Sequence, residues 1–266
     1  MGPLVGNDSP GWATTALDAA LWMQRSAEYE GVALQTWAMA GRIMRLGLED
    51  TTWTAALEQS EGYGSLPPAV IVDVDETILD NSPYAARLIE TREGYSDESW
   101  DLWVNEAQAR AVPGALEFAL LARELGVEVF YVTNRKSHLE DGTQRNLAAM
   151  GFPAGKADDV YLLARERDEW GSDKTTRRAF VAENYRVLLL AGDDLNDFVS
   201  GARSRREARV ALMDEHESKW GSRWIMLPNP TYGSWENAIT FGESGLSRDE
   251  VLDRKLKALD SAKIED

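Results

Sequence analysis

The sequence contains no cysteine and only two histidines among its 266 residues. The lack of cysteine excludes disulfide bonds and removes one indicator of the redox compartment. No apolar run approaches the roughly 20 residues that a membrane-spanning helix needs, so no membrane span is expected. The first 12 residues carry neither a basic stretch nor an apolar stretch, so they do not form a signal peptide. The protein is then either cytoplasmic or exported with a signal upstream of Met1.

Basic residues are scarce as well, because 28 Lys and Arg stand against 45 Asp and Glu, for a net charge of −17. This charge argues against a nucleic-acid polymer or an anionic membrane surface as a partner. An anionic substrate would need a local cationic pocket within the negative field. Hydrophobic residues make up 44% of the chain, which is enough for a sizeable core.

Apolar strands alternate with helical segments from residue 69 to about 228. This alternation predicts an α/β fold of Rossmann-like form, with a parallel sheet between helices and a smaller helical domain beside it. The expected strands are 69–72, 127–132, 160–163, 186–191, 208–212 and 223–227.

The predicted domains are an α/β core over residues 66–242, with a helical insertion at about 82–112, and a small α domain. The α domain combines the N-terminal segment 10–60, this insertion and a C-terminal helix at 246–264. Apolar residues recur every three or four positions between 12 and 47, which indicates one or two helices. Gly31 and Gly41 interrupt this pattern, and a further short helix is expected at 51–58.

Polar clusters follow three of the expected strands: DVDET at 73–77, TNRK at 133–136 and GDDLND at 192–197. The carboxyl ends of parallel strands lie along one edge of a sheet, where open α/β sheets bind ligands. The three clusters should therefore converge there, together with Lys174 at the start of a predicted helix. A lone pair of carboxylates after a strand is as often a solvated acidic turn, so this convergence is what favours a functional site.

The converging carboxylates would be those of Asp73, Asp75, Asp193 and Asp197. Four negative charges in one place need a cation. Carboxylate oxygens without histidine or cysteine are typical ligands of magnesium or calcium, and magnesium also suits phosphate chemistry.

The same edge of the sheet should also carry hydrogen-bond donors for a phosphoryl group. These are the hydroxyl of Thr133, the backbone N–H of Asn134 and the ammonium of Lys174. In such a site a carboxylate can attack phosphorus and form an aspartyl-phosphate. Two alternatives stay open at this point. Lys174 is otherwise a solvated charge at a helix start, and Arg135 either binds substrate or only offsets the acidic charge around it.

These motifs, in this order, resemble the class C acid phosphatases of the haloacid dehalogenase superfamily, which include lipoprotein 5′-nucleotidases. The family's signature IVDxDETxLxNxxY is met by residues 71–84, and its signature GDNLxDF by residues 192–198. Asp194 replaces the Asn or Thr usual in the second signature, which adds negative charge beside the metal and puts metal affinity in question. The resemblance extends over about residues 20–240.

The resemblance implies that Asp73 is the nucleophile. Asp75 would be the general acid and base, with its backbone carbonyl on the metal, and an acidic pH optimum follows because Asp75 must be protonated when the alcohol leaves. Thr133 and Lys174 would hold the phosphoryl group.

The resemblance also implies a Mg²⁺ site in which Asp73 and Asp193 bind directly and Asp197 binds directly or through water. The expected substrates are small phosphomonoesters, with nucleoside monophosphates favoured. Trp100 and Tyr232 would stack on the base, with packing of Trp100 in the core as the alternative.

Two further hypotheses keep the fold and change the function. One is a non-catalytic phosphate-ester-binding or storage protein, which the presence of Asp73 disfavours. The other is dehalogenation or C–P cleavage, against which the DxDET form and Asp75 argue. Family members are periplasmic or lipid-anchored at the surface of bacteria, so export is expected, and a homodimer stays open.

Overall fold

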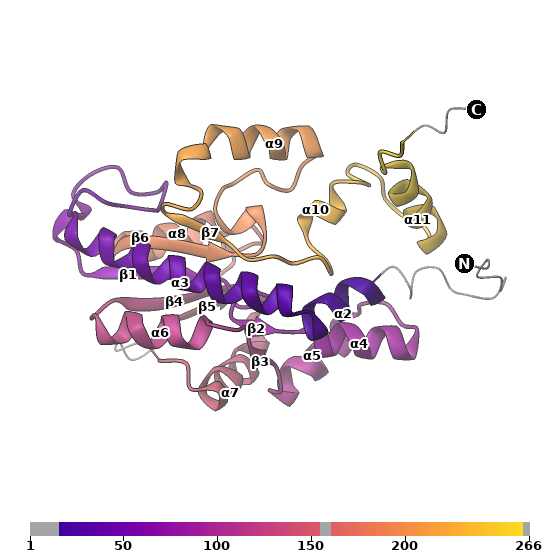
Figure 1. Cartoon of the computed structure of the whole chain (residues 1–266), viewed down its shortest axis with the longest axis horizontal. Coiled ribbons are helices and arrows are strands. Elements are labelled where there is room, and N and C mark those ends of the chain that lie inside the picture. Colours follow the sequence, from indigo (N-terminus) through magenta and orange to yellow (C-terminus); the bar gives the residue numbers. More distant parts are fainter. Residues whose placement is uncertain (1–15, 155–160, 263–266) are drawn as a thin grey trace.

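The computed structural model describes residues 16–154 and 161–262. Within them, five parallel strands form one sheet in the order β5-β4-β1-β6-β7. The strands are β1 (Pro68–Val72), β4 (Glu128–Lys136), β5 (Leu162–Arg165), β6 (Arg186–Gly192) and β7 (Trp224–Met226). The predicted α/β class is confirmed by this sheet and its helices (Figure 1). Parts of the expected elements, at 10–15, 160 and 263–264, lie outside the described residues.

Helices alternate with these strands and also precede and follow the sheet. They are α2 (Leu17–Arg25), α3 (Ala27–Glu49), α4 (Ser82–Thr91), α5 (Asp97–Glu106), α6 (Ala115–Glu124), α7 (Glu140–Met150), α8 (Thr175–Ala182), α9 (Arg206–Glu215), α10 (Ser234–Asn237) and α11 (Arg248–Lys257). Single 3₁₀ turns lie at Tyr63–Ser65, Ser137–Leu139, Leu195–Asp197 and Glu217–Lys219.

The central strand β1 is buried on both faces because its side chains alternate between two hydrophobic clusters. Val70 and Val72 pack in the cluster that contains the buried residues of α3 and α6. Ala69 and Ile71 pack in the opposite cluster, which contains Val181 of α8. Figure 1 shows α3 and α6 side by side along one face of the sheet. The apolar run of β1 thus lies in the sheet that forms the middle layer of the molecule.

The N-terminal helical segment breaks at Ser26, whose extended backbone separates α2 from α3 and whose hydroxyl accepts a hydrogen bond from the Tyr29 N–H. Ser is a preferred N-cap for this reason. Gly31 and Gly41 lie within α3 and do not interrupt it. A Cβ on Gly41 would lie 3.1 Å from the Leu121 side chain, so this glycine permits the close approach of α3 to α6.

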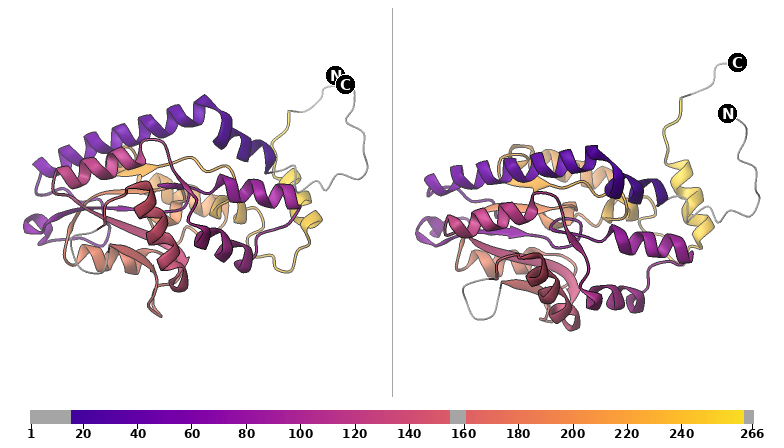
Figure 2. Two further views of the ribbon diagram at one scale, coloured as in Figure 1. Left: turned by 90° about the horizontal axis from the view of Figure 1, so that it is seen from below. Right: turned by 60° about the horizontal axis from the view of Figure 1, so that its bottom comes forward.

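The two N-terminal helices contact different parts of the molecule. α3 shares the core of the sheet, whereas α2 packs against α4 of the insertion. α2, α4, α5 and α11 lie at one end of the molecule in Figure 1 and in both views of Figure 2. The small α domain therefore remains a prediction, with α2 beside the insertion and α3 on the sheet.

Three local predictions differ from the structure. Residues 208–212 are not a strand but part of α9, in which Leu212 and Met213 pack inward and Val210 is 41% exposed. Residues 51–58 form no helix, because the Ala55 N–H bonds to the Val187 carbonyl and so follows the sheet. The C-terminal helix ends at Lys257 rather than at residue 264.

The strand order decides where the polar clusters meet. β1 lies between β4 and β6, so the segments that follow β1 and β6 and the end of β4 are neighbours. A two-stranded antiparallel ribbon, β2 (Leu79–Asp80) with β3 (Arg110–Ala111), frames the insertion and was not expected from the sequence. Among the described residues, every helix is too short or too polar to cross a bilayer.

Candidate active site

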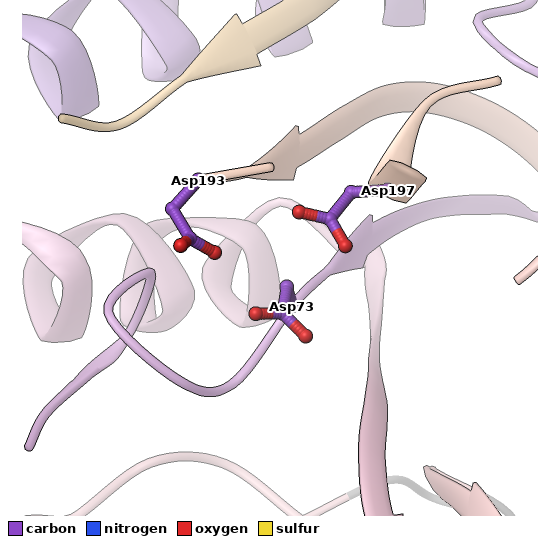
Figure 3. A group of neighbouring side chains, drawn as sticks. All are labelled: Asp73, Asp193 and Asp197. Carbon is purple, nitrogen blue, oxygen red and sulfur yellow. The ribbon is translucent and has the colours of Figure 1, made fainter. Parts of the chain in front are cut away.

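Three carboxylates converge at the carboxyl edge of the sheet (Figure 3). Asp73 follows β1, Asp193 follows β6, and Asp197 lies in the 3₁₀ turn after it. One oxygen from each of the three lies within 4.8 Å of the others. Gly192 at the end of β6 makes this possible, because a Cβ there would collide with the Asp197 carboxylate. The predicted convergence of the strand ends is thus present in the geometry.

Lys174 is the cation inside this cluster. It is 3% exposed, and its Nζ contacts the Asp73 carboxylate and lies 2.6 Å from Oδ1 of Asp197. The solvated alternative for this lysine does not fit such burial. One ammonium faces three carboxylates, so negative charge remains in excess. Burial, opposed by Lys174, raises the pKa of Asp73 to about 7, and burial raises the pKa of Asp193 well above its usual range.

The donor set of this cluster fits a divalent cation. Asp73, Asp193 and Asp197 offer only carboxylate oxygens, the ligands of hard metal ions. Burial is the main cause of these raised pKa values, and a cation among the carboxylates would offset the neighbouring negative charges that add to it. The side chain of Asp75 is not a member of this group; its predicted metal contact runs through the backbone carbonyl and stays a prediction.

The Asp75 carboxylate is instead held by three neighbours. The Arg135 guanidinium donates to it, with Nη2 2.7 Å and Nε 3.1 Å from Oδ1. Asn81 donates to the same oxygen at 2.9 Å, and the Thr133 hydroxyl lies 3.3 Å from Oδ2. These contacts fix the direction of Asp75, so Arg135 and Asn81 are positioning residues for it.

Glu76 was not predicted as a site residue, yet it is buried and organises the turn after β1. Its backbone has φ 55°, a left-handed conformation that costs a non-glycine residue energy and is often found at functional sites. Its carboxylate accepts the Asn81 N–H at 2.8 Å and the hydroxyl of Tyr232. Burial and the Asp75 charge raise the pKa of Glu76 to about 8. The DxDET spacing predicted the turn, but it did not predict that Glu76 binds Asn81 and Tyr232.

The end of β4 is held from behind by Arg177, which is fully buried. Its guanidinium donates to the Thr133 carbonyl and, at 2.6 Å, to the side-chain oxygen of Asn134. The Asn134 amide in turn donates to the Ser172 carbonyl at 3.1 Å. The predicted phosphate-binding roles of Thr133 and Asn134 stay predictions. The sequence does not single out Arg177, because nothing local separates it from the other basic residues near Lys174.

The loop after β7 supplies two further contacts that the sequence did not predict. Asn229 donates to Oδ2 of Asp193 at 2.8 Å. The Asp194 carboxylate accepts the Ser234 N–H at 2.6 Å and the Asn196 N–H at 2.9 Å. Asp194 was expected to add charge beside the metal, but its carboxylate is used to tie this loop to the turn after β6.

A cavity of about 640 Å³ opens over the cluster. Asp73, Lys174, Trp100 and Tyr232 all line it, so the structure brings the two predicted stacking residues to the same cavity. The Arg135 guanidinium lies 5.5 Å from the centroid of the Trp100 ring. The Tyr232 residue is 43% exposed while its hydroxyl reaches Glu76. This volume is typical of sites for small organic ligands.

Curated relatives match about three fifths of the chain. "Acid phosphatase 1" of Solanum lycopersicum is 30% identical over 167 residues, which cover 61% of this chain and 57% of that protein. A "Stem 31 kDa glycoprotein" of Glycine max is 26% identical over 165 residues, which cover 61% of this chain and 58% of that protein. The chain thus spans less than two thirds of the length of these relatives.

Solved structures match nearly the whole chain. The class C acid phosphatase from Bacillus anthracis with tungstate bound has a TM-score of 0.82 at 28% identity, over 94% of this chain and 99% of that one. A second structure of the Bacillus anthracis class C acid phosphatase has a TM-score of 0.81 at 30% identity, over 95% and 99%. The family model for subfamily IIIB of the HAD superfamily, described as acid phosphatase, matches residues 13–235. The chain therefore belongs to the acid phosphatase family that forms subfamily IIIB of the HAD superfamily.

Proposed function

We propose that the protein is a magnesium-dependent acid phosphatase that hydrolyses small phosphomonoesters through an aspartyl-phosphate on Asp73. The observation that carries the proposal is the position of Asp73, which is buried, lines a cavity and contacts Lys174. One residue separates it from Asp75, whose carboxylate is oriented by Arg135. The Bacillus anthracis relative binds tungstate, a tetrahedral oxyanion with the shape of phosphate. The same cavity in this chain is proposed to bind a phosphoryl group.

In the first step, Lys174 and the donors at the end of β4 hold the phosphoryl group while an oxygen of Asp73 attacks phosphorus. The bond between phosphorus and the alcohol oxygen breaks. Asp75 gives its proton to that oxygen, so the alcohol leaves neutral. Arg135 and Asn81 keep Asp75 directed at the leaving group.

In the second step, Asp75 takes a proton from a water molecule that attacks phosphorus. The bond between phosphorus and the Asp73 oxygen breaks, which releases inorganic phosphate and restores both carboxyl groups. Because Asp75 must carry a proton when the alcohol leaves, we expect activity to be highest at acidic pH.

Asp73, Asp193 and Asp197, with the backbone carbonyl of Asp75, would hold the Mg²⁺ ion. When bound, the ion neutralises charge on the phosphoryl oxygens. Exhaustive chelation should abolish phosphate release and added Mg²⁺ should restore it. Unchanged activity after chelation would refute the metal assignment.

The proposed function is tested by a phosphate-release panel of nucleotides, sugar phosphates and aryl phosphates, with and without Mg²⁺. Asp73→Asn should abolish turnover on every substrate and leave the folded structure intact, because an amide does not attack phosphorus. Circular dichroism and thermal unfolding check the fold. A folded Asp73→Asn protein with full activity would refute the mechanism.

The same panel separates the alternatives. A binding or storage protein would bind phosphate esters with Mg²⁺ present and release no phosphate from any of them. A dehalogenase would release halide from a haloacid and leave the phosphate esters intact. Both arms use the intact chain.

Nucleoside monophosphates are the proposed preferred substrates, because Trp100 and Tyr232 line the cavity with Asp73. Stacking contributes about 1–3 kcal/mol per base and tolerates any base. Trp100→Ala or Tyr232→Ala should lower kcat/KM at least about tenfold on a nucleotide and leave a small alkyl phosphate nearly unchanged. An equal loss on both substrates would assign these residues to the fold or the phosphate site.

Export in a bacterium and a homodimer are also proposed and await their own tests. A native reading frame with an upstream signal would support export. Light scattering on the purified chain would measure the oligomer.

A further inference from the structure

The cavity over Asp73 extends well past the phosphoryl site. Part of its wall is formed by α4, through Tyr84 and the aliphatic residues Ala85, Leu88 and Ile89. The three aliphatic residues are spaced i, i+3 and i+4, so they lie on one face of the helix. The function proposed above, with its two stacking residues, makes no use of this wall.

The wall is apolar and half-buried. Leu88 packs against the main hydrophobic core, which fixes the inner side of the wall. Tyr84, one turn earlier, is buried and packs edge-on against Trp100 with centroids 5.1 Å apart. The side chains of Ala85, Leu88 and Ile89 carry no hydrogen-bonding group for the edge of a base or for a sugar hydroxyl. The hydroxyl of Tyr84, which also lines the cavity, is already paired with the Ser99 hydroxyl at 2.8 Å.

We propose that this wall is a subsite for an apolar leaving group, so that the enzyme accepts phosphomonoesters of alcohols with an unbranched alkyl or acyl chain. The inference rests on the proposed phosphatase function and adds a substrate class to it. With the phosphate at Asp73, the chain of the alcohol runs past Trp100 and along Leu88 and Ile89. An alkyl chain suits this wall because Ala85, Leu88 and Ile89 are aliphatic and offer no partner to the polar groups of a nucleoside.

The test is a series of n-alkyl monophosphates with two, four, six and eight carbons, assayed below their micellar concentrations with the full chain and Mg²⁺. Each methylene that leaves water for the wall should raise kcat/KM about two- to fourfold. The series should level off once the chain outgrows the wall. A matched series with a terminal hydroxyl should rise less.

Ile89→Asn puts a polar side chain of similar size into the wall. It should weaken the rise of kcat/KM with the length of the alkyl chain. The rate on ethyl phosphate should stay within about twofold of the wild type. Leu88→Asn serves as a second variant. Leu102→Asn is the control, because Leu102 is 61% exposed on α5 and does not line the cavity; it should keep the wild-type slope.

The outcomes separate the two proposals. A flat wild-type series with clear hydrolysis of ethyl phosphate and p-nitrophenyl phosphate overturns the apolar subsite and leaves the phosphatase function standing. A slope that survives both wall variants in folded protein also overturns the subsite. No hydrolysis of any ester overturns both.

Discussion

At the scale of single residues, Arg135 is the side chain with the most direct control over Asp75. It is 3% exposed and is itself fixed by a hydrogen bond from Nη1 to the Thr143 hydroxyl at 3.0 Å. Its guanidinium contacts both oxygens of Asp75. A planar fork of donors determines the orientation of a carboxylate better than a point charge does. We therefore expect Arg135 to act on the proposed reaction through Asp75.

Replacing Arg135 by Gln should lower kcat/KM on an alkyl phosphate by about 10- to 100-fold, since a misdirected general acid loses part of its contribution. The loss should be several-fold smaller on p-nitrophenyl phosphate, whose leaving group needs little protonation. Lys136→Gln is the control, because Lys136 is exposed and pairs with Asp97 away from the cluster. Equal losses on both substrates would mean that Arg135 acts on phosphate binding or on the fold.

Residue types and strand ends predicted that four carboxylates converge, and the structure brings three of them together, with the side chain of Asp75 directed to Arg135 instead. Asp73 and Asp75 are two positions apart, and the sequence treats them alike. Asp73 becomes a cluster member and Asp75 an oriented partner because of Lys174, which directly precedes α8, and Arg135, which lies on β4. Such directions are set by tertiary packing, so local sequence patterns do not contain them.

At the scale of elements, the loop after β7 is held to the turn after β6 by Asp194. Its carboxylate accepts from two backbone N–H groups, and the Ser234 hydroxyl also donates to it. Arg209 of α9 donates to that same hydroxyl. The loop in turn brings Asn229 to Asp193 and Tyr232 to Glu76. One substitution at Asp194 should therefore loosen both sides of the site.

Asp194→Ala should lower the free energy of unfolding by about 2 kcal/mol, because it leaves two backbone N–H groups without acceptors. In a chain of this size this corresponds to a fall in Tm of about 4–8 °C. Asp194→Asn should cost less, since an amide oxygen still accepts. Asp168→Ala, at an exposed position, is the control. A changed Mg²⁺ affinity with an unchanged Tm would instead support the role beside the metal.

The elements were predictable where one local signal dominates. β1 and β6 are apolar runs bounded by turn residues, and both form as expected. The predictions were wrong where the apolar pattern fits both the two-residue period of a strand and the 3.6-residue period of a helix, or where no local pattern exists. Residues 208–212, Ala-Arg-Val-Ala-Leu, fit a short strand or one face of a helix, and the inward packing of Leu212 and Met213 decides for α9. The β2–β3 ribbon pairs segments about 30 residues apart, which no local pattern indicates.

At the scale of the whole molecule, the net charge is −17, and we expect a metal ion at the carboxylate cluster to contribute to the stability of the fold. Without a bound cation, the ion pairs of Lys174 with Asp73 and Asp197 offset only part of the negative charge of the buried carboxylates at the sheet edge. Burial raises the pKa of Asp73 to about 7 and that of Glu76 to about 8, against ordinary values near 4. The folded metal-free protein therefore holds protons that the unfolded chain releases.

Because of this difference, the stability of the metal-free protein should fall as the pH rises. A carboxyl group whose pKa is raised in the folded state contributes fully below its unfolded pKa, and the contribution is lost as pH rises through the folded pKa. The Tm of EDTA-treated protein should therefore fall between about pH 5 and pH 8. Protons compete with the metal for the same oxygens, so the rise in Tm on adding Mg²⁺ should be small at pH 5 and large at pH 8. Asp193→Asn removes one of the buried carboxylates whose pKa is raised. It should weaken both the fall of Tm with pH and the pH dependence of the Mg²⁺ effect. A Tm of metal-free protein that rises over this range, with a Mg²⁺ effect independent of pH, would mean that these carboxylates are ionised and compensated without a metal.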